Sequence, residues 1–162
     1  MVNLIARKRV GGSNVIAMAS HYDTKYFEKV RSVGANDGGS STGLLLELAR
    51  VLAGKRDAFD YWFVFLDGEE AFVEWSTFDS TYGSRHLAKR WQDDGTASRV
   101  RALILLDMIG EKSLGIIKDT NSTPWLMDLV WNTAIEEGLR DTLSSVVEPM
   151  QDDHVPFLDA HI

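Results

Sequence analysis

The chain has no cysteine, and only three of its 162 residues are proline. Without cysteine there is no disulfide bond, no thiolate zinc site and no cysteine nucleophile, so histidine, aspartate and glutamate remain as metal ligands. Positive charge is also scarce: 17 Lys and Arg residues against 24 Asp and Glu residues give a formal net charge of −7. Because such a surface repels a phosphate backbone, we expect no nucleic-acid partner.

Long hydrophobic runs are also missing. Tyr61 to Leu66 is the most apolar stretch of the later chain and is too short to cross a bilayer. Met1 to Val10 carries charge and lacks the apolar run of a signal peptide. We therefore expect no membrane partner. There is no internal repeat, low-complexity tract or proline-rich linker, which predicts a single domain over residues 1–162.

Hydrophobic residues make up 44% of the chain, which is enough for a sizeable core. Tyr61 to Leu66 and Ala102 to Leu106 are uninterrupted apolar runs, which predict central strands covered on both faces. Asn3 to Ala6 and Val15 to Ala19 flank the turn signal Gly11 to Asn14, which predicts two strands joined by a hairpin-like connection.

Helical patterns lie between these strands. Apolar residues recur at helical spacing in Thr42 to Ala53 and again in Ser84 to Trp91. A third helix is marked by Thr123 as a cap, Pro124 at its first position and Gly138 at its end. Strands that alternate with helices predict an α/β fold with a largely parallel sheet at its centre.

Charged residues follow each predicted strand: His21 and Asp23; Asp67, Glu69 and Glu70; and Asp107. In open α/β sheets, ligands bind at the carboxyl edge of the strands, so these side chains are expected to converge. The set expected around this edge is His21, Asp37, Glu69, Glu70, Asp107 and Asp152. Such a set suits zinc and leaves a carboxylate free to carry a proton.

Each residue taken singly has an alternative. Asp37 suits a turn or a helix cap, and His21 suits a hydrogen-bonded structural histidine. Asp107 suits a cap or a loop, and the segment Asp152 to His154 suits a solvated acidic turn. The convergence of the whole set is what favours a functional site.

The pair Glu69 and Glu70 is more informative than a single residue. Two adjacent carboxylates leaving a buried strand repel one another unless a cation or a proton relieves them. Neighbouring side chains on an extended segment also point in opposite directions, so one can bind metal while the other faces a substrate. Trp75 follows the pair in a loop and is a candidate to line a pocket.

Eight segments match a known family in order along nearly the whole chain: Ser20 to Lys25, Gly34 to Asp37, Phe65 to Phe72, Trp75 to Ser76, Asp79 to Ser80, Tyr82 to Leu87, Leu105 to Gly110 and Gln151 to Phe157. On these segments the chain resembles zinc-dependent exopeptidases of the aminopeptidase type, and within them the glutaminyl cyclase branch. The insertion Ala71 to Tyr82, which carries Trp75, resembles the cyclase branch more closely than the aminopeptidases. Such a series is more specific than any single motif.

The resemblance implies a three-layer sandwich, in which helices flank a mixed sheet with a parallel centre. It implies zinc as the cofactor, with Asp37 and Glu70 as ligands and Glu69 as the general acid and base. It also implies that Asp107 and Asp152 position the reacting groups and that Trp75 lines the pocket. In the two-metal aminopeptidases, His21 and Asp107 would hold a second zinc ion with Asp37 bridging.

The activity implied by the resemblance is conversion of an N-terminal glutamine of a peptide to pyroglutamate with release of ammonia. Two alternatives remain open: a zinc aminopeptidase, and a catalytically inactive scaffold or fragment of this fold. The family also implies a secreted or periplasmic protein.

Family members continue beyond the segment that matches Asp152 to Phe157 with a core strand and a loop that supplies a histidine ligand, and they carry helices before the first strand. Here the sequence stops at Ile162. We therefore expect a fragment of the family core that self-associates through an exposed sheet edge.

Overall fold

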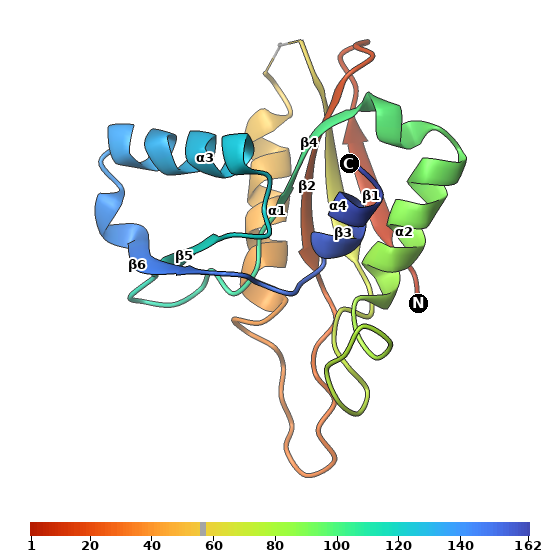
Figure 1. Ribbon diagram of the computed structural model, residues 1–162, viewed down its shortest axis with the longest axis vertical. Helices are drawn as coiled ribbons and strands as arrows, with labels where there is room; N and C mark the ends of the chain where they lie inside the picture. Colours follow the sequence, from red (N-terminus) through yellow and green to blue (C-terminus); the bar gives the residue numbers. More distant parts are fainter. Residues whose placement is uncertain (56–57) are drawn as a thin grey trace.

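The computed structural model describes residues 1–55 and 58–162. Its main element is a four-stranded sheet in the order β1 (Leu4–Lys8), β3 (Asp60–Leu66), β2 (Val15–His21) and β4 (Val100–Leu105) (Figure 1). β1 is antiparallel to β3, whereas β2 runs parallel to both β3 and β4. This confirms the expected mixed sheet with a parallel centre.

Helices cover both faces of the sheet, as expected for three layers. On one face, Trp62 and Val64 of the sheet pack against α2 (Tyr82–Asp93) and α4 (Val155–Asp159). On the other face, Phe63 packs against α1 (Gly39–Leu52). Figure 1 shows α1 on one side of the sheet and α2 with α4 on the other. Successive β3 side chains therefore enter opposite cores, as the pleat requires.

The predicted hairpin between the first two strands is wrong, because β3 lies between them and pairs with both. β1 ends in two basic residues, Arg7 and Lys8, and is largely exposed, which suits the edge of a sheet. β3 is buried on both faces and takes the central place.

The central position predicted for Ala102 to Leu106 is also wrong within the described residues. β4 pairs there with β2 alone, and its residues are half-buried rather than buried. An apolar run reports that the faces of a strand are covered but not whether both of its edges are paired. Self-association through this edge stays a prediction.

A second, smaller unit lies beside the main sheet and was not predicted apart from its helix. β5 (Ile116–Asp119) and β6 (Leu143–Glu148) form a two-stranded parallel sheet, and α3 (Pro124–Glu136) connects them. Thr123 stands at the predicted N-cap position without a side-chain capping bond, and Gly138 follows the helix with a positive φ of 75°. None of the α3 residues is fully buried.

Two 3-10 turns complete the described elements: η1 (Thr96–Arg99) before β4, and η2 (Arg140–Thr142) before β6. Among the described helices, none has the length and apolar character needed to cross a membrane.

Candidate active site

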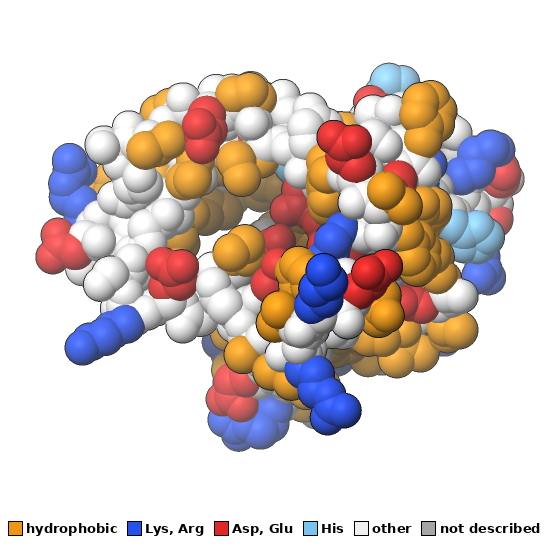
Figure 2. All heavy atoms as spheres, turned by 90° about the horizontal axis from the view of Figure 1, so that it is seen from below, with side chains coloured by type: hydrophobic (Ala, Val, Ile, Leu, Met, Phe, Trp, Pro, Cys, Tyr) orange, Lys and Arg blue, Asp and Glu red, His pale blue; other side chains and the backbone are white. Residues whose placement is uncertain are grey.

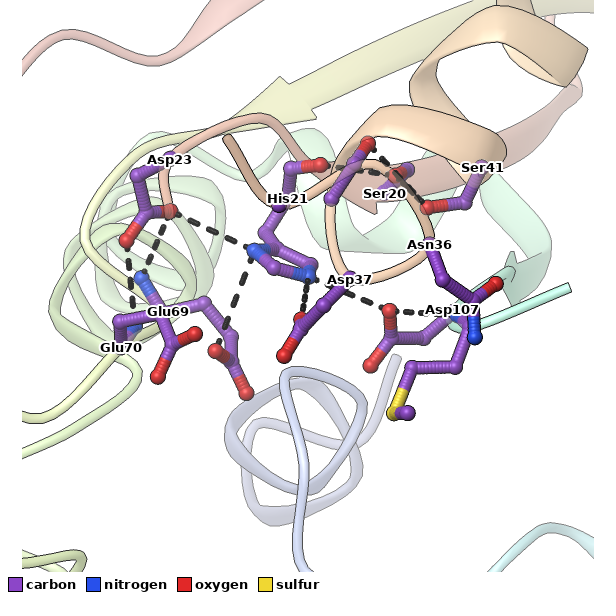
Figure 3. A network of polar contacts seen from close by, with 12 residues as sticks. Ser20, His21, Asp23, Asn36, Asp37, Ser41, Glu69, Glu70 and Asp107 are labelled. Atoms are coloured by element: carbon purple, nitrogen blue, oxygen red, sulfur yellow. Dashed lines mark hydrogen bonds and ion pairs between the residues drawn. The ribbon is translucent and has the colours of Figure 1, made fainter. Parts of the chain in front are cut away.

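His21 is the last residue of β2, and its side chain is 1% exposed. Its Nε2 atom lies 3.1 Å from Asp37 Oδ1 and 3.1 Å from Asp107 Oδ1. Its Nδ1 atom lies 3.6 Å from Asp23 Oδ1 and 3.9 Å from Glu69 Oε2. A single imidazole is thus surrounded by four carboxylates from three loops (Figure 3).

The sheet topology produces this convergence. β3, β2 and β4 run parallel, so the loops that carry Glu69, His21 and Asp107 leave the same edge of the sheet. Gly38 lets the loop that carries Asp37 lie close to Asp23 and His21. Its φ is 82°, and a Cβ atom there would lie 2.6 Å from the Asp23 carbonyl oxygen. Only glycine allows this close approach.

Asp37 does not cap α1, because Gly38 occupies the N-cap position and no side-chain capping bond forms. Asp37 instead contacts His21, so the helix-cap alternative is wrong. His21 likewise shows more than an ordinary structural hydrogen bond, because four carboxylates lie within 3.9 Å of its ring nitrogens.

Asp23 binds the backbone of the acidic pair, Glu69 and Glu70. Its two carboxylate oxygens accept hydrogen bonds from the backbone N–H groups of Glu69 and Glu70, each at 3.1 Å. Burial alone would raise the pKa of Asp23, but hydrogen bonds from His21 and from these two amides hold it below its ordinary value. Its place after a strand was visible in the sequence, whereas its role depends on a contact with a segment 46 residues away.

Asp107 is held by its own neighbour. Met108 has a φ of 46°, and its N–H group donates to Asp107 Oδ1 at 2.7 Å. The following loop is tied to the start of α1, since the Gly110 N–H group donates to Asn36 Oδ1 at 2.7 Å. A left-handed conformation at a residue other than glycine costs free energy, and such residues cluster at functional sites.

Two groups of side chains among the described residues have ligand atoms within 4.8 Å of one another: His21, Asp37 and Asp107, and Glu69, Asp107 and Asp152. Asp107 belongs to both. The buried Nδ1 atom of His21 has no hydrogen-bond partner among the described residues. An imidazole and carboxylates are the nitrogen and oxygen donors that zinc accepts, so these residues fit a zinc site.

Glu70, the other expected ligand, lies outside both groups. It is half-buried, and burial together with the charge of Asp37 raises its pKa. Glu69, expected as the acid and base, lies inside the second group with Asp107 and Asp152. The structure thus brings Asp37, His21, Glu69, Asp107 and Asp152 together, with Glu70 close to Asp37.

Burial raises the pKa values of Glu69 and Asp152 in this cluster. Burial raises the pKa of Glu69 to about 9, with the charge of His21 opposing the shift and that of Asp152 adding to it. Burial and the charge of Asp107 raise the pKa of Asp152 to about 7. Burial would lower the pKa of His21, yet hydrogen bonds to Asp107 and Asp23 raise it to about 11. The cluster therefore holds excess negative charge that a proton or a cation relieves.

The segment Asp152 to His154 is not a solvated turn. Asp153 is 1% exposed and accepts a hydrogen bond from Ser84 Oγ at 2.5 Å, which joins this segment to α2. Burial raises the pKa of Asp153 to about 6. The sequence suggested no role for Asp153, because its partner lies 69 residues away.

Trp75 is 42% exposed and lines a groove of about 550 Å³ together with Gln151 and Asp152. The groove continues along α2 and α4. Figure 2 shows acidic side chains gathered beside a hollow on the face viewed from below. A peptide bound at the carboxylates would therefore have an apolar wall beside it.

The chain belongs to peptidase family M28, which matches residues 3–162. Within this class it is similar to the glutaminyl-peptide cyclotransferase of Drosophila melanogaster, at 31% identity over 188 residues, covering 99% of this chain and 52% of that protein. The expected family is thereby confirmed. The chain spans about half the length of the curated relatives it matches.

Solved structures agree. A glutaminyl cyclase from an Acidobacteriales bacterium has a TM-score of 0.95 and 43% identity, covering 99% of this chain and 55% of that one. A leucine aminopeptidase precursor from Bacteroides thetaiotaomicron has a TM-score of 0.84 and 27% identity, covering 99% and 61%. The relatives are thus enzymes of two kinds, acyltransferases and metallopeptidases, that share this fold.

Proposed function

We propose that this chain carries the catalytic core of a zinc-dependent glutaminyl-peptide cyclotransferase. The substrate is a peptide with an N-terminal glutamine, and the products are an N-terminal pyroglutamate and ammonia. In this proposal residues 1–162 act as one α/β domain. The observation that carries it is the Glu69 carboxyl group, which is 6% exposed and has a pKa of about 9 beside Asp107 and Asp152.

The reaction needs one group that accepts a proton and later returns it. The α-amine of the substrate attacks its own side-chain amide carbon, so that a new C–N bond forms and the bond to the amide nitrogen breaks. Glu69 takes the proton from the attacking amine and gives it to the departing nitrogen, which leaves as ammonia. The buried carboxyl group can hold the proton between the two steps, and a cation bound beside it would favour the ionised form that accepts the proton first.

Asp107 and Asp152 position the reacting groups in this scheme. Both have ligand atoms within 4.8 Å of a Glu69 oxygen. With a pKa raised to about 7, Asp152 retains a proton near neutral pH and can donate a hydrogen bond to the developing negative charge on the amide oxygen. Trp75 lies in the adjacent groove, where its ring excludes water from one side of the substrate.

Zinc, when bound, supplies Lewis-acid polarisation of the amide carbonyl group. The residues proposed to hold it are Asp37, Glu70 and His21. The carboxylates of Asp37 and Asp107, each 3.1 Å from Nε2 of His21, support a cation at this place.

A zinc aminopeptidase is the second candidate, and one observation favours it. Two potential metal-binding groups share Asp107, an arrangement that suits two-metal hydrolysis. In that reaction Glu69 would take a proton from water, and the water would attack the first peptide bond. The similar leucine aminopeptidase precursor supports this alternative.

Mass spectrometry of a short peptide that begins with glutamine distinguishes these functions. The purified chain with added zinc is expected to release ammonia and leave a pyroglutamyl peptide, and Glu69→Gln is expected to lower the rate at least about 100-fold. Glu74→Gln is the matched control, because Glu74 is an exposed glutamate in the neighbouring loop and should leave the rate unchanged.

Release of free glutamine that depends on Glu69 would instead establish the aminopeptidase. An unchanged peptide in the presence of zinc would reject catalysis by this chain and favour the inactive fragment. A rate that is equal in the Glu69→Gln variant would reject Glu69 as the proton carrier.

A further inference from the structure

Asp119 is the last residue of β5, in the small sheet outside the cluster of carboxylates described above. It is only 9% exposed. A carboxylate removed from water costs free energy unless hydrogen bonds satisfy it, so its burial calls for a structural reason.

Both oxygens of Asp119 are used. Oδ1 accepts hydrogen bonds from the backbone N–H groups of Asn121 at 2.9 Å and Met150 at 2.8 Å. Oδ2 accepts from Ser122 Oγ at 2.6 Å and lies 3.0 Å from Nε2 of His154. Burial alone would raise the pKa of Asp119, but the bonds from Ser122 and from the two amides hold it below its ordinary value. The group is therefore ionised at neutral pH.

These partners flank Asp152 in the sequence. Met150 lies two residues before it, and His154 lies two residues after it. A second bond reinforces the first attachment, because the Asn121 side-chain amide donates to the Met150 carbonyl oxygen at 2.7 Å. One carboxylate of the small sheet thus holds the backbone before Asp152 and lies beside the side chain of His154 after it.

Asp152 needs such a restraint. It lies close to Glu69 and Asp107, and the charge of Asp107 repels the ionised form of Asp152. Its Oδ1 atom accepts a hydrogen bond from the N–H group of the next residue, Asp153, which orients the side chain but does not fix the segment. On the other side, Ser84 of α2 holds Asp153. The backbone on the Met150 side is fixed through Asp119.

We propose that Asp119 is a positioning residue, which holds Asp152 at the carboxylate cluster by binding the backbone of Met150, two residues before it. It does not touch the substrate. The catalytic part of this inference rests on the proposed function, whereas the restraint on the backbone can be tested without it.

The test compares three variants of the whole chain: Asp119→Ala, Asp119→Asn and Asp128→Ala. Asp128 is the matched control, because it is also an aspartate of the small unit but forms an exposed ion pair with Lys118. Asn at position 119 keeps one acceptor oxygen for the amides and loses the charge, so it is expected to fall between the unaltered chain and Asp119→Ala.

Hydrogen exchange, followed by mass spectrometry, measures the restraint. Asp119→Ala is expected to speed exchange in residues 149–154 about tenfold, while exchange in β2 and β3 stays unchanged. Asp119→Asn is expected to give a smaller increase and Asp128→Ala none. Equal exchange in the unaltered chain and both Asp119 variants overturns the inference. If Asp119→Ala does not fold, the Asp119→Asn variant decides by the same criterion.

Kinetics measure the positioning. Asp119→Ala is expected to lower kcat about 10- to 100-fold and to change KM less than about threefold, with most of the loss recovered in Asp119→Asn. The positioning role is overturned if kcat falls only in proportion to the fraction of folded protein. It is also overturned if Asp128→Ala lowers kcat equally. If the unaltered chain forms no pyroglutamate, the proposed function fails, and the exchange experiment still decides whether Asp119 restrains the segment.

Discussion

Two sets of carboxylates in this protein differ in what surrounds them. Glu69 and Asp152 lie at the edge of the main sheet among other carboxylates, and burial raises the pKa of both. Asp23, Asp79 and Asp119 lie in loops that turn N–H groups toward them, and their pKa values are lowered. The pKa of a carboxyl group is thus raised in one set and lowered in the other, according to the supply of hydrogen-bond donors.

Asp79 shows the second kind of environment most clearly. Its oxygens accept from the N–H groups of Phe72 and Val73 at 2.8 Å and of Glu74 at 3.0 Å, and from the Tyr82 hydroxyl at 2.8 Å. Donors of this kind satisfy the charge and leave little capacity for a ligand. In the cluster of Glu69 and Asp152, lone pairs stay free and charge stays uncompensated, and this unsatisfied state is what can bind a cation or exchange a proton.

Zinc binding should show the largest difference between the two sets. Zinc at 100 times its Kd is expected to stabilise the chain by about 2.7 kcal/mol, which raises Tm by roughly 5–10 °C for a domain of this size. Asp37→Asn should abolish the shift, because Asp37 is a proposed zinc ligand whose Oδ1 atom lies 3.1 Å from Nε2 of His21, a second proposed ligand. Thermal unfolding at pH 8 measures it.

Asp128→Asn serves as the control, since Asp128 is 59% exposed and lies outside both groups. An equal zinc shift in Asp37→Asn and in the unaltered chain would contradict the assignment of the metal site.

The pH dependence of stability should differ in sign between the sets. The pKa values of Asp152 and Glu69 are raised in the folded state to about 7 and about 9. Their stabilising contribution is fully present below their ordinary pKa and is lost as pH rises through the folded values. His21, raised to about 11, acts in the same direction above its ordinary pKa. Without metal, Tm is therefore expected to fall by several degrees between pH 4 and pH 9.

Asp152→Asn should flatten the part of this decline between pH 4 and pH 7. Asp23 and Asp119 have lowered pKa values, so their contribution is present above the ordinary carboxyl pKa and is lost as pH falls below it. The metal-free chain is thus expected to be most stable near pH 4 to 5. A Tm that rises steadily toward pH 9 would be incompatible with carboxylates that are buried without donors.

Removal of a satisfied carboxylate should have a smaller and local effect. Asp79→Ala is expected to open the loop 71–80 without a large change in Tm, because Phe72, Val73 and Phe78 are already exposed and leave little packing to lose. Cleavage by chymotrypsin after Phe72 and Phe78 should then become several-fold faster. Glu74→Ala is the control, since only its backbone takes part in the network; equal cleavage in both variants would show that Asp79 does not order the loop.

Local patterns in the sequence were sufficient for the elements of the main sheet and for most of the site. The continuous apolar run at Tyr61 to Leu66 identified β3, and helical spacing identified α1, α2 and α3. The acidic residues after the strands identified the edge at which the site forms. A pattern of this kind reports burial and direction, which depend on residues close together in the chain.

The sequence alone determined that His21, Glu69 and Asp107 stand at or just after the ends of apolar strands, so that charge would collect at one edge. Only the tertiary structure decided that β3 separates β1 from β2, that Asp23 holds the amides of Glu69 and Glu70, and that Asp119 reaches Met150. Strand order and these hydrogen bonds join segments about 30 to 50 residues apart. Their partners are selected by the packing of the whole chain, because no local propensity encodes a distant acceptor.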